Sequence, residues 1–191
     1  MALPCSAYSA QNILIFGDSL SAGYGISRDV SWANLLQQEL KKTHSQYEVV
    51  NASISGETTS GGLRRIAKAM QAHQPALVIL ELGANDGLRG LSNSETEKNL
   101  DKIIKQVRSA NAKVLLVGMQ LPPNYGAAYT KQFSSMYPKL AKKRHIALVP
   151  FMLKGIPAEQ FQADNLHPNA LAQGQILHNV LPALTLLLNA K

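Results

Sequence analysis

The chain of 191 residues contains a single cysteine, Cys5. One cysteine excludes a disulfide within the chain and leaves no cysteine-rich metal site. The sequence also lacks an apolar run of the roughly 18 residues that a membrane-spanning helix needs, since polar residues and a proline interrupt its longest candidate, Ile176–Leu188. Internal repeats, low-complexity tracts and linkers are absent as well. These absences predict one domain, and the chain is long enough to bury a substantial core.

Charged residues make up only 16% of the chain and hydrophobic residues 46%, which is ordinary for a globular domain. The 19 lysines and arginines outnumber the 12 aspartates and glutamates, so that the formal net charge is +7. Such a charge favours anionic ligands: phospholipid head groups, coenzyme A phosphates or nucleic acid. No nucleic-acid-binding motif accompanies it. We therefore expect no nucleic-acid partner and transient contact with lipid surfaces, with the oligomeric state open and a monomer favoured.

The first ten residues, Met1–Ala10, are small and apolar and resemble the tail of a signal peptide. The charged segment and the full apolar segment of a signal peptide are missing. The alternative is an ordinary flexible terminus. We assign residues 1–11 to this segment and 12–191 to the domain, and expect a periplasmic or secreted protein, with a cytoplasmic one as the alternative.

Apolar runs rich in β-formers alternate with stretches of helical periodicity. The expected strands are Ile13–Phe16, Tyr47–Asn51, Leu77–Leu82, Lys113–Met119 and Ala147–Pro150. The expected helices are Ser31–Lys42, Ser60–Ala72, Ser94–Ala110 and Ala128–Lys143, with a last helix after Pro168. Ser94 and Glu97 have the spacing of a capping box. The alternation predicts a three-layer α/β/α sandwich with about five parallel strands and helices on both faces.

The most informative segment is Ile13–Leu20, where an apolar run ends abruptly in a small, polar turn. Gly17 permits tight backbone geometry, and Asp18 and Ser19 are good helix N-cap residues. Ligands of open α/β sheets bind outside the carboxyl ends of the strands, so Ser19 is a candidate nucleophile. The alternative is that Asp18 and Ser19 only cap and turn the chain.

Three further segments place small or polar residues just after an expected strand: 53–58, 83–86 and 164–168. In a parallel sheet these ends converge on one edge. Acyl transfer needs hydrogen-bond donors there for the developing oxyanion. The backbone N–H groups of Ser19 and Gly56 and the side-chain amide of Asn85 are candidates. The alternative for Gly56 and Asn85 is plain turn chemistry.

Asp164 and His167 are three residues apart and Pro168 follows them. Proline is favoured at the first helical position, which predicts His167 at the start of the last helix. A turn could bring the Asp164 carboxylate to one imidazole nitrogen and leave the other free as a base. A serine hydroxyl is a weak nucleophile unless such a base takes its proton. The alternative for His167 is a capping or surface histidine.

These motifs resemble the SGNH hydrolase family over residues 12 to about 188. The matching residues are Gly17-Asp18-Ser19-Leu20, Gly56, Gly83-x-Asn85-Asp86 and Asp164-x-x-His167-Pro168. The resemblance implies a flavodoxin-like sheet, with Ser19 as nucleophile, His167 as base and Asp164 orienting it. It also implies an oxyanion hole formed by Ser19, Gly56 and Asn85. Segments 51–59, 81–90 and 121–126 are similar to the bacterial multifunctional thioesterase I branch, described as acyl-CoA thioesterase, arylesterase and lysophospholipase and often periplasmic.

Two loops are candidates for substrate binding. The first is either a mobile lid or a plain loop, and it contains Asp86, Gly87, Leu88 and Arg89. The second either lines an acyl groove or is a rigid turn, and it contains Leu121, Pro122 and Tyr125. Asp18 and Asp86 are also expected to hold the turns that present Ser19 and Asn85.

The residues and the resemblance predict a serine hydrolase without metal or cofactor that cleaves small-molecule esters and thioesters of fatty acyl chains. Two alternatives stay open. One is a carbohydrate O-acetyl esterase, which the same fold and residues serve. The other is a basic α/β binding module without chemistry. The physiological substrate, the preferred chain length and the balance of ester over thioester cleavage are not readable from the sequence.

Overall fold

The computed structural model of the protein describes residues 11–190, and Cys5 and the signal-peptide-like segment Met1–Ala10 lie outside them. Five strands form one sheet in the order β2-β1-β3-β4-β5, with every neighbouring pair parallel. They are β1 (Gln11–Gly17), β2 (Tyr47–Asn51), β3 (Leu77–Glu81), β4 (Lys113–Val117) and β5 (Ala147–Val149). Gln11, assigned from the sequence to the N-terminal segment, instead pairs with Tyr47.

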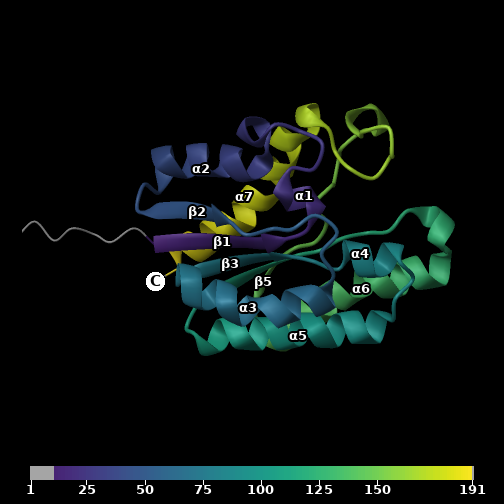
Figure 1. Cartoon of the computed structure of the whole chain (residues 1–191), viewed down its shortest axis with the longest axis horizontal. Helices are drawn as coiled ribbons and strands as arrows, with labels where there is room; N and C mark the ends of the chain where they lie inside the picture. The colour runs from purple at the N-terminus through teal and green to yellow at the C-terminus, as the bar shows by residue number, and fades with distance from the viewer. Residues whose placement is uncertain (1–10, 191) are drawn as a thin grey trace, which may run out of the picture.

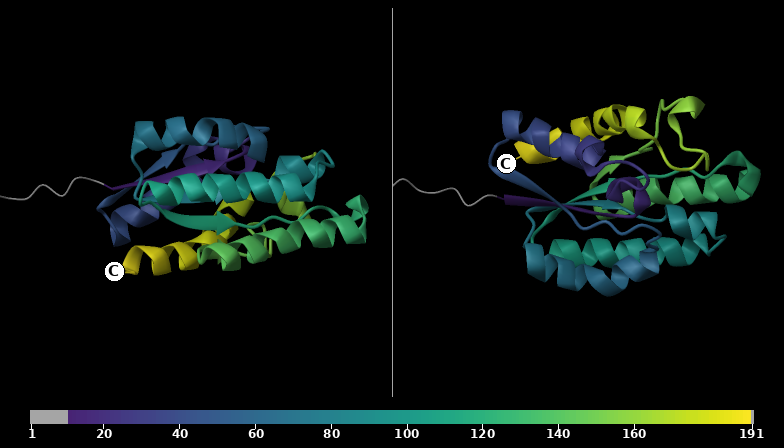
Figure 2. Two further views of the ribbon diagram at one scale, coloured as in Figure 1. Left: turned by 90° about the horizontal axis from the view of Figure 1, so that it is seen from below. Right: turned by 45° about the horizontal axis from the view of Figure 1, so that its top comes forward.

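Helices cover both faces of this sheet, which confirms the three-layer sandwich (Figures 1 and 2). They are α1 (Ser19–Ala22), α2 (Trp32–Thr43), α3 (Thr59–His73), α4 (Ala84–Leu88), α5 (Asn93–Ser109), α6 (Ala127–Arg144) and α7 (Gln173–Asn189). Helices α2 and α7 pack together on one face, and α3, α5 and α6 on the other. The central strands β1 and β3 are therefore buried on both sides, which explains their continuous apolar runs.

The sequence misplaced the start of α5. The N-cap is Ser92, whose hydroxyl accepts a hydrogen bond from the Glu95 N–H, and not Ser94. Ser92 and Glu95 have the same capping-box spacing as Ser94 and Glu97, so the motif alone could not choose between the two registers.

The C-terminal helix has the length and composition of a membrane span over Ala170–Asn189, with a mean hydropathy of 1.2. It packs against α2, β4 and β5 in the structure. Its residues Ile176, Val180 and Leu184 are fully buried in the hydrophobic core. We therefore describe α7 as a core helix.

The strand order reverses between β1 and β3, which is the topological switch point of a flavodoxin-like sheet. Crossovers from these two strands leave toward opposite faces, so a crevice opens at their carboxyl ends. Ser19 follows β1 and Asn85 follows β3. The fold thus places both residues at this crevice.

Candidate active site

Ser19 is the first residue of α1, directly after the sharp turn that ends β1. The Asp18 carboxylate caps this short helix by accepting a hydrogen bond of 3.0 Å from the Leu20 N–H. Gly17 is required because a Cβ there would collide with the buried carboxylate of Glu81. Ser19 is only 8% exposed, yet it lines a mainly apolar cavity at this edge of the sheet.

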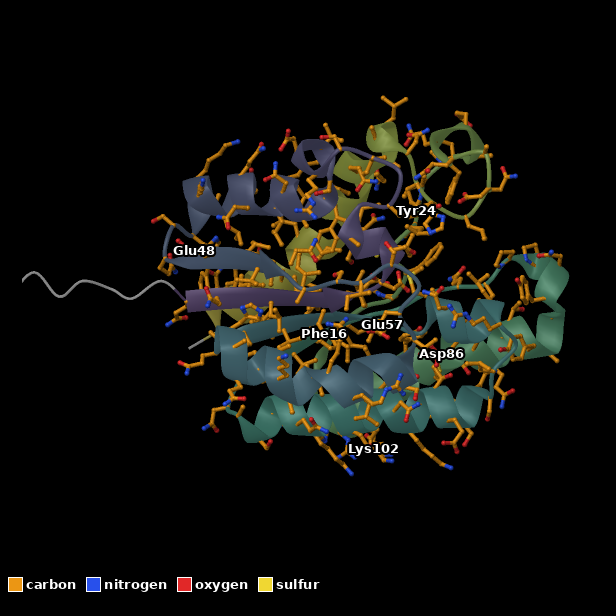
Figure 3. All side chains as sticks on the ribbon, viewed as in Figure 1. Phe16, Tyr24, Glu48, Glu57, Asp86 and Lys102 are labelled. Carbon is orange, nitrogen blue, oxygen red and sulfur yellow. The ribbon has the colours of Figure 1, made fainter. Side chains whose placement is uncertain are left out.

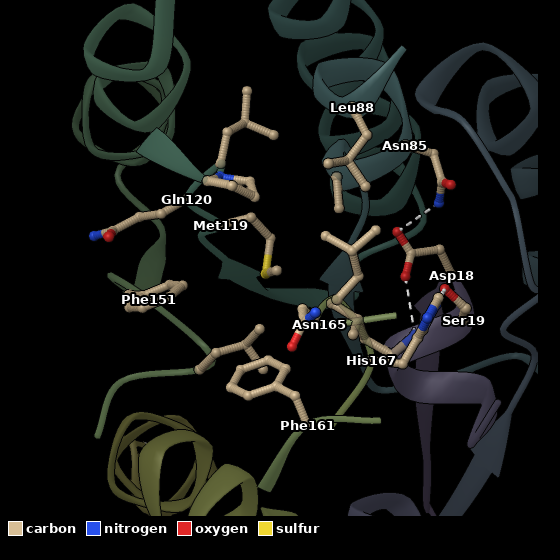
Figure 4. A pocket seen from close by; sticks show the side chains of 16 residues that line it. Asp18, Ser19, Asn85, Leu88, Met119, Gln120, Phe151, Phe161, Asn165 and His167 are labelled. Carbon is tan, nitrogen blue, oxygen red and sulfur yellow. Dashed lines mark hydrogen bonds between the residues drawn. The ribbon is translucent and has the colours of Figure 1, made fainter. Parts of the chain in front are cut away.

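A chain of hydrogen bonds connects Ser19 to two residues about 150 positions away in the sequence. His167 Nε2 lies 2.9 Å from Ser19 Oγ, and His167 Nδ1 lies 2.6 Å from Asp164 Oδ2. The other carboxylate oxygen of Asp164 accepts the backbone N–H groups of Leu166 and His167, at 2.9 and 3.0 Å. Figure 4 shows Ser19 and His167 together at one end of the cavity. This arrangement lets the imidazole take a proton from the hydroxyl while the carboxylate holds its tautomer.

His167 lies in a loop and not at the start of a helix, which corrects the interpretation of Pro168. The loop folds back on itself through an antiparallel bridge between Phe161 and Pro168. The Gln162 N–H also donates to the His167 carbonyl at 2.8 Å. Asn169 then caps a 3-10 turn, and α7 begins only at Gln173. Pro168 therefore marks the end of this hairpin-like loop and not the first residue of the last helix.

The Asp164 carboxyl is held in its ionised form. Partial burial tends to raise its pKa, but the hydrogen bonds from the His167 N–H, the His167 imidazole and the Leu166 N–H together lower the pKa to about 2. The carboxylate can therefore accept the imidazole N–H at any pH above this value.

The Asn85 side chain is oriented by Asp18. Asn85 Nδ2 donates a hydrogen bond of 3.0 Å to Asp18 Oδ2, as Figure 4 shows. An ionised carboxylate only accepts hydrogen bonds, so it selects the amide nitrogen of Asn85 and not the oxygen. The second N–H of the amide makes no hydrogen bond within residues 11–190. Within residues 11–190, the N–H groups of Ser19 and Gly56 have no hydrogen-bond partner either.

Asp18 is fully buried and has a second buried carboxyl beside it. Burial raises its pKa to about 6, against the opposing effects of the Leu20 and Asn85 hydrogen bonds. Glu81 is also fully buried, and burial and the nearby Asp18 charge raise its pKa well above the usual range. Glu81 Oε2 accepts from the Ser21 hydroxyl at 2.7 Å and from the Asp18 N–H at 3.2 Å. With a pKa of about 6, Asp18 is mostly ionised at neutral pH, whereas burial favours the neutral form of Glu81.

A cavity of about 350 Å³ extends from Ser19 and His167 between the strand ends (Figure 4). Three of the seven expected substrate-binding residues line it: Leu88, Leu121 and Pro122. Its other apolar walls were not recognised in the sequence, and they include Leu20, Met119, Phe151, Leu153, Phe161 and Leu166. The signal that could have found Phe151, Phe161 and Leu166 is that large apolar residues recur in the connection between β5 and α7.

Four expected substrate-binding residues do not line the cavity: Asp86, Gly87, Arg89 and Tyr125. Asp86 is buried and accepts hydrogen bonds from the Thr59 N–H and hydroxyl, which agrees with its expected structural role. Gly87 packs behind Leu121, where a Cβ would be too close. Arg89 donates to the Gly56 carbonyl at 3.0 Å, and the Tyr125 hydroxyl donates to the Leu88 carbonyl at 3.2 Å. Residues 84–88 form the helix α4 and not the expected loop. Arg89 connects the end of this helix to the Gly56 turn, and Tyr125 connects it to the turn Pro123–Tyr125.

Within residues 11–190, no three His, Cys, Asp or Glu side chains gather in a way that could hold a metal ion. The groups available for chemistry in the cavity are the Ser19 hydroxyl, the His167 imidazole and the free N–H donors.

Comparison with known proteins identifies a family and several relatives of this chain. Residues 15–174 match the model of the GDSL-like lipase/acylhydrolase family. Esterase TesA of Pseudomonas aeruginosa is 46% identical over 182 residues, which cover 94% of this chain and 90% of the relative. Thioesterase 1/protease 1/lysophospholipase L1 of Escherichia coli is 46% identical over 169 residues, or 87% of this chain and 80% of the relative.

Among solved structures, the psychrotrophic esterase EstA from Pseudoalteromonas, inhibited by monoethylphosphonate, superimposes with a TM-score of 0.89. It is 38% identical, and the match covers 94% of this chain and 100% of the EstA chain. Sequence motifs, fold and comparisons thus agree, and the chain is a hydrolase that belongs to the GDSL-like lipase/acylhydrolase family.

Proposed function

We propose that the protein hydrolyses esters and thioesters of fatty acyl chains, with Ser19 as nucleophile, His167 as general base and Asp164 as the residue that orients His167. The observation that carries this proposal is the continuous hydrogen-bond chain Asp164–His167–Ser19 at the end of an apolar cavity. The esterase and thioesterase names of the two relatives support the same reaction class.

The first half of the reaction forms an acyl-enzyme. As Ser19 Oγ bonds to the acyl carbon, its proton moves to His167 Nε2. The carbonyl electrons move onto oxygen, and the N–H groups of Ser19, Gly56 and Asn85 stabilise the resulting oxyanion. The bond to the leaving oxygen or sulfur then breaks, and the alcohol or thiol takes the proton from His167.

The second half repeats these steps with water. His167 takes a proton from water as its oxygen adds to the acyl carbon. The bond to Ser19 Oγ then breaks, Oγ regains a proton from His167, and the fatty acid leaves. Every proton taken by His167 is returned, so the enzyme is regenerated without a cofactor.

The apolar walls of the cavity favour a fatty acyl chain over an acetyl group. Burial of one CH₂ contributes about 0.8 kcal/mol, so each methylene that enters the cavity is expected to lower KM by up to about fourfold. A carbohydrate O-acetyl esterase would gain nothing from these walls. Apolar lining also gives no reason for a basic binding module to select an anionic ligand there.

The test is a panel of p-nitrophenyl esters from acetyl to palmitoyl, an acyl-CoA and a lysophospholipid. The panel is assayed with wild type, Ser19→Ala and the control Ser27→Ala, whose exposed hydroxyl makes no capping bond. We expect activity that increases with chain length and is lost only in Ser19→Ala. Activity confined to acetyl esters would support the carbohydrate esterase, and hydrolysis that survives Ser19→Ala would overturn the mechanism.

For location, we propose the periplasm or the exterior, supported by the small, apolar residues of Met1–Ala10. Contact with lipid surfaces is supported by the net charge of +7. Cell fractionation tests the first proposal. Co-sedimentation with anionic and with zwitterionic vesicles tests the second, since only the anionic vesicles should retain the protein.

A further inference from the structure

Arg65 connects the two loops that carry the main-chain donors of the proposed oxyanion hole. Its Nη1 donates to the Ala52 carbonyl at 2.8 Å, just after β2. Its Nη2 donates to the Gly17 carbonyl at 3.4 Å, two residues before Ser19. Its Nε donates at 2.6 Å to the carboxylate of Glu57, the residue after Gly56. One planar guanidinium thus holds both loops.

The guanidinium itself is held in one orientation. It stacks 3.8 Å from the centroid of the Phe16 ring at the end of β1. Arg65 and Glu57 form a largely enclosed ion pair, with side chains 21% and 12% exposed. Phe16 and Glu57, which Arg65 contacts, are labelled in Figure 3 near the carboxyl end of β1. A planar, stacked group with several directed donors fixes the positions of its acceptors, which a lysine cannot do.

The surrounding sequence is adapted to this contact. Gly61 lies in the first turn of α3, although glycine is a poor helix former. A Cβ at Gly61 would overlap the Glu57 carboxylate. The glycine therefore leaves the space that Glu57 needs to reach Arg65.

Two other hydrogen bonds also join these segments. The Ile54 N–H donates to the Gly17 carbonyl at 3.1 Å, the same oxygen that Arg65 contacts, and Asn51 Nδ2 donates to the Ser21 carbonyl at 2.7 Å. On the far side of Gly56, Arg89 donates to its carbonyl. The Ser19 and Gly56 N–H groups make no hydrogen bond of their own within residues 11–190, so their spacing depends on contacts made by neighbouring residues.

We infer that Arg65 is a positioning residue that sets the spacing between the Ser19 and Gly56 N–H groups, and thereby the strength of the oxyanion hole. This role rests on the proposed function, because it has a consequence only if an oxyanion forms at Ser19. Arg65 itself does not touch the substrate. Its contribution appears in the transition state and not in substrate binding, since a misplacement of about 1 Å can cost about 100-fold in rate.

The test compares Arg65→Met with Arg64→Met. Methionine keeps an apolar stem against Phe16 but makes none of the three contacts. Arg64 precedes Arg65 in the same helix, is exposed, and within residues 11–190 donates only to the Ser60 hydroxyl. We expect Arg65→Met to lower kcat about 100-fold, the effect of losing one oxyanion donor, with KM within about twofold. Arg64→Met should change neither constant by more than about twofold.

A second readout separates positioning from general structural damage. An alkyl boronic acid adds to the serine hydroxyl and gives a tetrahedral adduct, whereas the fatty acid product binds without one. For Arg65→Met we expect boronate affinity to fall by about the same factor as kcat, and product affinity to stay within about twofold. If Arg65→Met does not fold, Arg65→Lys takes its place, with a smaller loss in the same pattern.

Two results overturn the inference while leaving the proposed function intact: an unchanged kcat in Arg65→Met, or equal losses of boronate and product affinity. In both cases Ser19→Ala remains inactive and the wild type active. A wild type that hydrolyses no ester or thioester of the panel overturns both proposals together.

Discussion

Two aspartates are hydrogen-bonded to residues proposed to carry the reaction, Asp164 to His167 and Asp18 to Asn85. The surroundings of the two carboxyl groups differ. Asp164 is in a loop, its side chain 38% exposed, and backbone and imidazole N–H groups lower its pKa to about 2. Asp18 is fully buried beside Glu81, and burial raises its pKa to about 6. The surroundings of Asp164 therefore stabilise its ionised form, whereas those of Asp18 destabilise the ionised form.

Their different surroundings indicate that the two carboxylates serve different parts of the site. Asp164 orients the base through His167 Nδ1. Asp18 orients the amide of Asn85, a proposed oxyanion donor, and caps the helix of the nucleophile. Environments that move two pKa values apart are a common sign of a division of roles. Substitutions at the two positions should therefore differ in their effects on rate and on stability.

The largest expected effect is at Asp164. Asp164→Asn leaves the shape of the side chain but favours the wrong imidazole tautomer, so kcat should fall about 10⁴-fold with little change in KM. The control is Glu159→Gln on the same exposed loop, which should stay within about twofold. Steady-state kinetics with a p-nitrophenyl ester measures both, and a loss below about tenfold in Asp164→Asn would exclude this role for Asp164.

A smaller loss is expected at Asp18. In Asp18→Asn, the introduced amide would no longer select the amide nitrogen of Asn85, which could then rotate and present its oxygen to the oxyanion. We expect Asp18→Asn to lower kcat by about 10²-fold, the usual cost of one oxyanion donor. Adding Asn85→Ala to this variant should cost little more, because both changes remove the same donor. Additive losses in the double variant would show that Asp18 does not act through Asn85.

The smallest effect on rate is expected at Glu81. Burial and the nearby Asp18 charge raise the pKa of Glu81 well above its usual range, which favours the neutral form that Glu81→Gln imitates. The glutamine oxygen can still accept from Ser21 and the Asp18 N–H. We expect kcat within about threefold of the wild type. A loss comparable to that of Asp18→Asn would mean that Glu81 is ionised.

Stability should depend on pH in opposite directions at the two aspartates. The folded pKa of Asp18 is raised, so its contribution to stability is present below about pH 4 and is lost as pH rises through about 6. Asparagine does not ionise, so Asp18→Asn is not destabilised in this way as the pH rises. We expect it to gain up to about 3 kcal/mol relative to the wild type between pH 4 and pH 8, at about 1.4 kcal/mol per pKa unit.

The folded pKa of Asp164 is lowered, so its contribution is present above about pH 4 and is lost as pH falls toward 2. Asp164→Asn should therefore be less stable than the wild type at pH 7, and the difference should shrink in acid. Solvent screening of this part-exposed group keeps the effect below about 1 kcal/mol. Urea unfolding at each pH measures both variants. For each variant, the free energy of unfolding relative to the wild type is plotted against pH. If this difference changes with pH in the same direction for Asp18→Asn and for Asp164→Asn, the contrast between the two carboxyls is contradicted.

The sequence predicted the elements whose signals are local. The continuous apolar runs of β1 and β3 identified a doubly covered parallel sheet, and that sheet places Ser19 and Asn85 at one edge. The boundaries of α2, α3, α5 and α6 were correct within two residues because helical periodicity marks them, although the cap of α5 was misread. The three-residue spacing of Asp164 and His167 predicted their contact because both residues lie in one turn.

Contacts between distant segments were not readable in this way. The three partners of Arg65 come from two separate loops, and its neighbour Arg64 looks the same in sequence. The selection of the Asn85 amide by Asp18 spans 67 positions. The walls Phe151 and Phe161 of the cavity lie in a long connection without helical or strand periodicity. Such contacts depend on how the loops pack, which only the folded chain specifies.

The most direct test of the central claim is labelling by a fluorophosphonate, followed by mass spectrometry of the intact protein and of its peptides. The wild type should gain one phosphonyl group, located at Ser19, and Ser19→Ala should gain none. Asp164→Asn should be labelled far more slowly than the wild type, because its His167 no longer activates the hydroxyl. Labelling at another residue, or equal labelling of Ser19→Ala, would contradict the account.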